Sequence, residues 1–175
     1  ELQFPFPGSG KDRSLRWFAA LLVAAAGPRA TVRFTDVTAA SGITIVNSTG
    51  DPDRKDYIFE VKGGGVGALD YDNDGWVDLV FSRGSSMERW RKGENPGPVL
   101  YRNRGDGTFE DVSEAAGIRG RRGTALGVVC SDLDGDGRTD IYVANDQMFS
   151  FAWMNRGDGT FVERAADLGI AVNEV

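Results

Sequence analysis

Two nine-residue segments of this chain carry carboxylates at a spacing that suits a hard cation. The segments 70–78 and 132–140 both read D-x-D-x-D-G-x-x-D, and each runs directly into an apolar stretch. Calcium takes six to eight oxygen ligands at flexible geometry, and a glycine at the sixth position permits a sharp turn. The sequence therefore predicts two calcium loops.

The predicted ligands are the side-chain oxygens of the first, third, fifth and ninth residues and the backbone carbonyl of the seventh. They are Asp70, Asp72, Asp74, Trp76 and Asp78 in the first loop, and Asp132, Asp134, Asp136, Arg138 and Asp140 in the second. These are not EF-hands, because Phe81 and Val143 stand where that motif needs a glutamate. The alternative is an acidic turn held by side-chain hydrogen bonds without a metal. Two copies in the same frame favour the metal, which would also relieve repulsion between the carboxylates.

The composition of the chain excludes several classes of partner and of catalytic site. The chain has 175 residues, 24 glycines, a formal charge of −6, no histidine and one cysteine. The charge argues against a nucleic-acid partner, since no basic stripe is present to neutralise phosphates. The lack of histidine excludes histidine-dependent catalysis and histidine-ligated zinc. Cys130 lies in an apolar run and is interpreted as a buried strand thiol rather than a nucleophile.

The first 30 residues are interpreted as a leader outside the folded part. Residues 17–26 are continuously apolar, follow basic residues and end in three alanines, as in a secretory signal peptide. The run is shorter than the ~20 residues of a transmembrane helix, so no membrane span is expected after its removal. A short buried helix or a membrane-proximal anchor is the alternative. The predicted location is extracytoplasmic: secreted, periplasmic or at the cell surface.

The rest of the chain is an internal repeat. Asn103 and Asn155 are 52 residues apart, as are Phe109 and Phe161, whereas the two acidic loops are 62 apart. The difference fits a longer loop within residues 82–98 of the first copy, a solvated insertion or a binding loop that presents Trp90. Apolar stretches joined by Gly-Asp-Gly predict β-hairpins.

Each repeat is expected to contain four strands. The predicted strands are 65–71, 77–82, 98–103 and 108–113 in the first copy, and 125–133, 140–146, 151–156 and 160–165 in the second. A four-stranded antiparallel meander at this spacing is typical of a propeller blade. The expected fold is all-β, an incomplete β-propeller with blade 1 at 65–118 and blade 2 at 119–175.

Two blades cannot close a propeller, which needs at least four. The segment 32–38 matches the fourth strand of each repeat, so residues 31–64 are expected to supply an N-terminal closing strand and a connecting loop. This arrangement predicts further blades beyond Val175. If the chain ends there, its open edges are expected to drive self-association.

The segments 34–43, 68–80 and 100–118 resemble the FG-GAP/VCBS-type repeat proteins, and most closely the cartilage acidic protein / ASPIC-UnbV group. The resemblance covers residues 32–171. It implies a seven-bladed propeller, structural calcium and export from the cytoplasm, and it implies no substrate. The chain is shorter than members of that group, and Glu163 and Arg164 stand where the family motif has Asp-Val.

The function favoured by these patterns is a non-catalytic, calcium-stabilised scaffold for binding or adhesion, with a protein or glycan as its ligand. Two Arg-Gly-Asp triplets, at 104–106 and 156–158, invite an integrin-ligand interpretation, but their shared repeat position already explains them as hairpin turns. The alternative function is part of a secreted propeller enzyme acting on glycans. Its catalytic residues would then lie largely outside this segment, and an acid–base pair within the segment would have to come from scattered residues such as Asp56, Glu60, Glu88 or Glu94.

Overall fold

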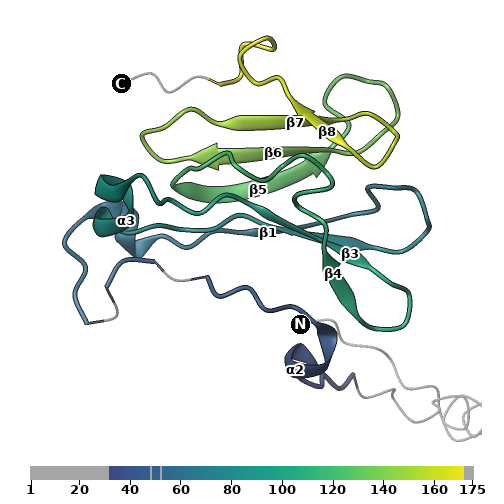
Figure 1. The fold of residues 1–175 in the computed structure, drawn as a ribbon, viewed down its shortest axis with the longest axis horizontal. Helices are drawn as coiled ribbons and strands as arrows, with labels where there is room; N and C mark the ends of the chain where they lie inside the picture. Colours follow the sequence, from purple (N-terminus) through teal and green to yellow (C-terminus); the bar gives the residue numbers. More distant parts are fainter. Residues whose placement is uncertain (1–31, 48, 52, 172–175) are drawn as a thin grey trace, which may run out of the picture. The chain divides into compact units, whose positions relative to one another are not determined.

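The computed structural model describes residues 32–47, 49–51 and 53–171, which contain two four-stranded antiparallel sheets (Figure 1). Blade 1 has the strand order β1-β2-β3-β4, and blade 2 has the order β5-β6-β7-β8. The strands are β1 Val66–Leu69, β2 Asp78–Phe81, β3 Val99–Asn103, β4 Phe109–Asp111, β5 Ala125–Ser131, β6 Asp140–Asn145, β7 Phe151–Asn155 and β8 Phe161–Glu163. All strands in each blade pair with their sequence neighbours. The prediction of two four-stranded blades is confirmed.

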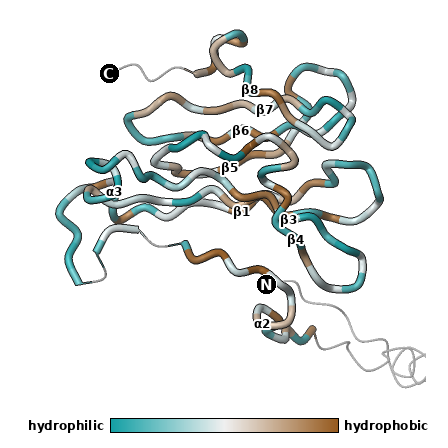
Figure 2. Tube along the Cα trace, in the orientation of Figure 1, coloured by the Kyte–Doolittle hydropathy of each residue, from teal (hydrophilic) through white to brown (hydrophobic). Residues whose placement is uncertain are grey.

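The main apolar core lies between the two blades, and β1 runs beside β5 (Figure 1). Its fully buried members include Val80 and Leu100 from blade 1 and Trp153 from blade 2. Burying side chains of this size contributes ~1.5–3 kcal/mol each. Apolar residues are concentrated on the strands, whereas the loops that leave them are hydrophilic (Figure 2).

Close approach of the two inner strands depends on Gly67 in β1. A Cβ atom at that position would lie 2.5 Å from the Sγ of Cys130 in β5. A buried polar contact fixes the same interface, since the side-chain amide of Asn155 donates to the carbonyl of Tyr71 at 2.9 Å. The ring of Tyr71 also stacks on Phe161, with ring centroids 6.1 Å apart. Polar and apolar contacts together set how blade 2 lies on blade 1.

The outer face of blade 2 is equivalent in the repeat to the face of blade 1 that packs against blade 2, but no described residues cover it. Ala116 and Ile118 follow blade 1 and are buried against blade 2. Their repeat counterparts, Leu168 and Ile170, are 37% and 36% exposed, and Val129, the counterpart of Gly67, is 58% exposed. Blade 2 therefore presents uncovered apolar side chains where blade 1 is covered by its neighbour.

Residues 32–37 form no strand, which differs from the predicted strand at 32–38. An outermost strand must pair with the third strand of its blade, and β3 and β7 already pair with β4 and β8. The one-turn helix α2, Thr38–Ser41, follows instead. The role of the N-terminal segment in closing a ring, and the predicted domain boundaries, stay predictions.

The chain just after residue 37 still packs as the repeat predicts. Gly42 and Gly117 both have positive φ, 77° and 75°. A Cβ on Gly42 would lie 2.8 Å from the carbonyl oxygen of Phe109 in blade 1, and one on Gly117 would lie 3.3 Å from that of Phe161 in blade 2. The segment around Gly42 thus occupies on blade 1 the place that the segment after β4 occupies on blade 2.

Two short helices complete the described part. The 3-10 helix η1 spans Ile58–Val61, and α3 spans Met87–Lys92 within the long β2–β3 connection. The side chain of Ser86 caps α3 by accepting from the backbone N–H of Arg89. The sequence predicts a solvated insertion or a binding loop here, and the structure places a helix in it. Trp90 on α3 is 51% exposed.

The leader and its signal-peptide-like run lie outside the described residues. Within the described residues, no helix combines the length and apolar character needed to cross a bilayer.

Candidate metal centres

The first aspartate of each acidic loop organises the turn that follows it. The carboxylate of Asp70 accepts from the backbone N–H groups of Asp74 and Gly75, at 3.1 and 3.0 Å. Asp132 does the same for residues 135–137, and the N–H of Gly137 is the largest of the contacts that lower the pKa of this carboxyl. Backbone N–H groups of each loop therefore fix the orientation of its first carboxylate.

The ninth aspartate of each loop is buried and connects the loop to the third strand through hydrogen bonds. Asp78 and Asp140 have no exposed surface. Asp140 accepts from the N–H of Leu133 in its own loop and from the N–H of Asn155 at the end of β7, both at 2.8 Å. Asp78 makes the equivalent pair of bonds, to the N–H groups of residues 71 and 103, at 3.0 and 2.7 Å. Burial raises the pKa of Asp78 in spite of these bonds.

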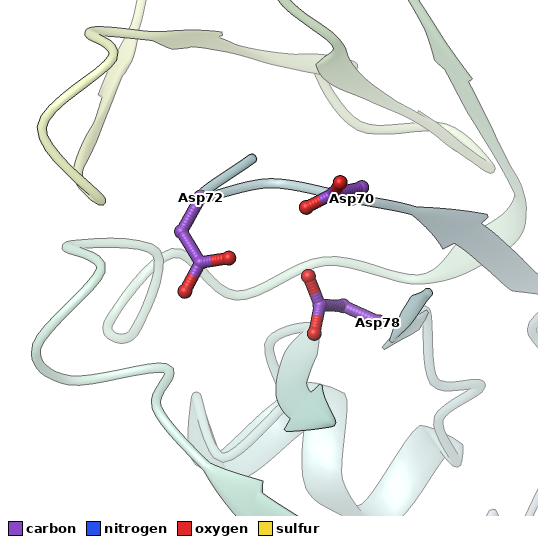
Figure 3. Close-up of side chains that lie close together, drawn as sticks. All are labelled: Asp70, Asp72 and Asp78. Atoms are coloured by element: carbon purple, nitrogen blue, oxygen red, sulfur yellow. The ribbon is translucent and has the colours of Figure 1, made fainter. Parts of the chain in front are cut away.

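Three carboxylates of the first loop converge on one point (Figure 3). Asp70, Asp72 and Asp78 each offer an oxygen, and these oxygens lie within 4.8 Å of one another. The Oδ1 atom of Asp72 is buried and has no hydrogen-bond partner. A buried carboxylate oxygen without a donor is costly unless a cation contacts it. This donor set, all hard oxygen, fits calcium.

The second loop gathers a different trio. Asp132, Asp134 and Asp136 offer oxygens within 4.8 Å of one another. Asp140 is not in this group, just as Asp74 is not in the group of the first loop. Each loop thus brings together three of its four predicted aspartates. The carbonyls of Trp76 and Arg138 stay predicted ligands.

Two arginine side chains contact the loop carboxylates; Arg102 was not predicted at the site, and Arg138 was predicted there only through its backbone carbonyl. Arg102 on β3 lies beside Asp72 and Asp74, with its Nε 2.8 Å from Asp72 Oδ2 and its Nη2 3.0 Å from Asp74 Oδ2. The Nε–H of Arg102 is not aligned for a hydrogen bond, so its contact with Asp72 is an ion pair without a hydrogen bond. Arg138 pairs with Asp136 in the second loop. Repeat counting could not reveal Arg102, because Met154 stands at its position in blade 2.

The Arg-Gly-Asp triplets form the hairpin turns next to the loops. A Cβ on Gly105 would lie 2.7 Å from the Trp76 ring, so the glycine makes room for that side chain. The carboxylate of Asp106 accepts from the N–H and the hydroxyl of Thr108, at 2.9 and 2.6 Å. Asp158 and Thr160 repeat these contacts. Turn geometry therefore accounts for both triplets.

Three of the four scattered carboxylates of the enzyme alternative, Asp56, Glu60 and Glu88, are occupied by structural contacts. Both oxygens of Glu60 accept backbone N–H groups, including that of Met87 at 2.8 Å. Asp56 pairs with Arg54 at 2.5 Å, and Glu88 pairs with Lys92 at 2.6 Å, which lowers the pKa of Glu88. A general acid requires the opposite shift.

Cys130 is half-buried, and burial raises the pKa of its thiol to about 11. A protonated thiol is a poor nucleophile.

The two kinds of aspartate in a loop respond differently to amidation. In calcium-free buffer with EDTA, Asp140→Asn is expected to lower the free energy of unfolding by about 1–3 kcal/mol, because an amide leaves one of two buried N–H groups without an acceptor. Asp134→Asn is the matched control, since Asp134 makes one long backbone contact, 3.3 Å from the N–H of Asp136. It is expected to change stability by less than about 0.5 kcal/mol. Urea denaturation measures both, and equal effects would contradict a separate structural role for the ninth aspartate.

Comparison with known proteins agrees with this geometry. Cartilage acidic protein 1 of Homo sapiens is 40% identical over 52 residues, which cover 30% of this chain and 8% of that protein. Cartilage acidic protein 1 of Mus musculus is 32% identical over 87 residues, 46% of this chain and 12% of that protein. The chain thus matches a small part of the length of these relatives. The family model described as FG-GAP-like repeat matches residues 70–143 and 132–173, which contain both acidic loops and together make up more than half of the sequence. The chain belongs to the FG-GAP-like repeat family.

Proposed function

We propose that this chain is a non-catalytic, calcium-stabilised segment of an extracytoplasmic β-propeller and that it serves as a binding scaffold. The observation that carries the proposal is the acidic loop repeated at the same place in both blades, with three converging carboxylates in each. The unpartnered buried oxygen of Asp72 supports it, because a cation is the contact that this atom lacks.

Calcium would act by holding the connection between the first two strands of each blade. In the first loop, Asp70, Asp72 and Asp78 would hold the ion, which would neutralise the repulsion between them. Asp78 also binds the end of β3, so the ion would be linked to three strands at once. An ion that binds only the folded chain stabilises it by mass action.

Two features support the extracytoplasmic location that we propose, the kind of metal site and the apolar run near the start of the sequence. The aspartates of the second trio are all exposed, and a site of this kind suits the weak binding found in extracellular calcium modules, with Kd of ~10⁻⁴–10⁻³ M. The signal-peptide-like run at 17–26 supports export. The similarity to cartilage acidic protein 1 agrees with it.

The scaffold has two kinds of partner: further blades, and a protein or glycan ligand. The open face of blade 2 would receive another blade, as blade 1 receives blade 2. Its exposed Val129, Leu168 and Ile170 are the counterparts of residues that face blade 2 from blade 1. In the absence of another blade, two copies of the chain would cover these faces.

The open face gives a prediction about mass in solution. Static light scattering of the chain is expected to show a mean mass that rises with concentration, and Val129→Lys should return it toward the monomer by charging the centre of the face. Val77→Lys is the control, because Val77 is similarly exposed, at 55%, but lies on the first acidic loop. A monomer at every concentration would contradict association through this face.

Calcium stabilisation is tested by thermal melting. The melting temperature of the chain is expected to rise by roughly 10–20 °C between excess EDTA and saturating calcium, since each of the two sites contributes ~2.7 kcal/mol when calcium is at a hundred times its Kd. The double variant Asp72→Ala, Asp134→Ala should lose this response. The double variant Asp106→Ala, Asp158→Ala removes the same charge from the neighbouring hairpin turns and should keep it. A parent chain that folds but melts at the same temperature in both buffers would refute the proposal.

A further inference from the structure

Arginines gather at the end of the blades opposite the acidic loops. The acidic loops follow β1 and β5, so antiparallel pairing places the β2–β3 connection (residues 82–98) and the approach to β5 (residues 119–124) at the other end of the strands (Figure 1). These two segments contain Arg83, Arg89 and Arg91, and Arg119, Arg121 and Arg122. The chain as a whole is acidic, with a formal charge of −6, so this concentration of positive charge is local.

Four of these arginines line one groove of about 460 Å³, and they are Arg83, Arg89, Arg119 and Arg122. Residues 94–98 and Gly120 form the rest of its lining. Among the described residues that line the groove, Glu94 is the single acidic one. The rigid Pro96-Gly97-Pro98 segment gives the groove one fixed wall.

Arg83 is held in place without a carboxylate. Its Nε donates to the carbonyl of Gly97 at 3.0 Å, and no ion pair joins it to a described acidic side chain. Burial, followed by the charges of Arg89 and Arg119, lowers the pKa of Arg83. The guanidinium is therefore half-desolvated among like charges, and an anion would relieve both costs.

The other arginines leave the groove positive. Arg89, on α3, is exposed, and its side chain makes no ion pair within the described part of the chain. Arg122 donates to the carbonyl of Gly93 and keeps its charge. Arg119 pairs with Asp111 at 2.7 Å and with Glu114 at 3.4 Å, so its charge is partly offset.

We propose that this groove binds an oxyanion group of an acidic ligand, with Arg83 and Arg89 as its main contacts. Guanidinium groups form paired, charge-assisted hydrogen bonds with sulfate, phosphate and carboxylate oxygens. Repulsion by the acidic loops at the other end of the strands restricts such a ligand to this end. The inference rests on the scaffold part of the proposed function and is independent of calcium at the loops.

The test is a titration of the full chain with sodium sulfate at constant ionic strength, with sodium chloride as the balancing salt, followed by amide NMR shifts. Saturable shifts are expected at Gly97 and Gly120. Arg89→Gln is expected to weaken sulfate binding at least about fivefold, because it removes a charge-assisted hydrogen-bond donor from the anion. This variant removes no contact that holds the fold, whereas Arg83→Gln also breaks the bond to Gly97. Parallel titrations with phosphate and acetate separate tetrahedral oxyanions from carboxylates as the ligand group.

Arg91→Gln is the matched control, because Arg91 lies on the same helix, carries the same charge and does not line the groove. It should leave the affinity for sulfate within about twofold of the parent, since distant exposed charges are screened. Shifts that do not saturate with any of the three anions, or equal losses in Arg89→Gln and Arg91→Gln, would overturn the proposal. The calcium melt is read on the same samples. Sulfate binding without a calcium response would refute the metal sites alone, and the reverse would refute the groove alone.

Discussion

The buried carboxylate at the ninth position of each acidic loop is the contact on which both blades depend. Asp78 and Asp140 have no exposed surface, yet each places a carboxyl group between strands. Each accepts one N–H from its loop and one from the end of the third strand. A charged group at such a place is tolerated only when its oxygens are satisfied. The loop conformation is thereby linked to the pairing of the strands behind it.

The same residue connects the loop to the proposed metal. In the first loop, the carboxylate of Asp78 lies close to those of Asp70 and Asp72, and it also accepts a hydrogen bond from the backbone of β3. Calcium there would bring three carboxylates together without repulsion and would strengthen the tie to β3. In the second loop, Asp140 keeps its backbone bonds but lies outside the trio. The two sites are alike in sequence but differ in which oxygens converge.

Most of the fold could be predicted from the sequence, because the repeat supplied two independent copies of every signal. Each of the eight strands predicted for the two blades overlaps an observed one, and the loops lie between the first two strands of each blade as expected. Local exceptions to the repeat were not predictable. Arg102 beside the first loop has Met154 as its counterpart, and α3 lies in an insertion that blade 2 lacks. The strand expected at 32–38 does not form for a different reason, since β3 and β7 already pair with β4 and β8 and leave it no free third strand within the described residues.

At the candidate metal sites, the residue types predicted the ligand chemistry but not the different structural role of each aspartate. Spacing alone made all four aspartates of a loop equivalent ligands. Burial and backbone hydrogen bonds distinguish them: the first organises the turn, the ninth joins strands, and Asp72 alone has a buried oxygen without a partner. Such roles depend on which N–H groups the folded chain brings near, and that information is not local in the sequence.

Each acidic loop is proposed to bind one calcium ion, and equilibrium dialysis tests this most directly by counting bound calcium per chain. Two ions per chain are expected at saturating millimolar calcium, and one after Asp134→Ala removes an oxygen from the second trio. Binding of no calcium by the folded chain, or an unchanged count in the variant, would contradict it.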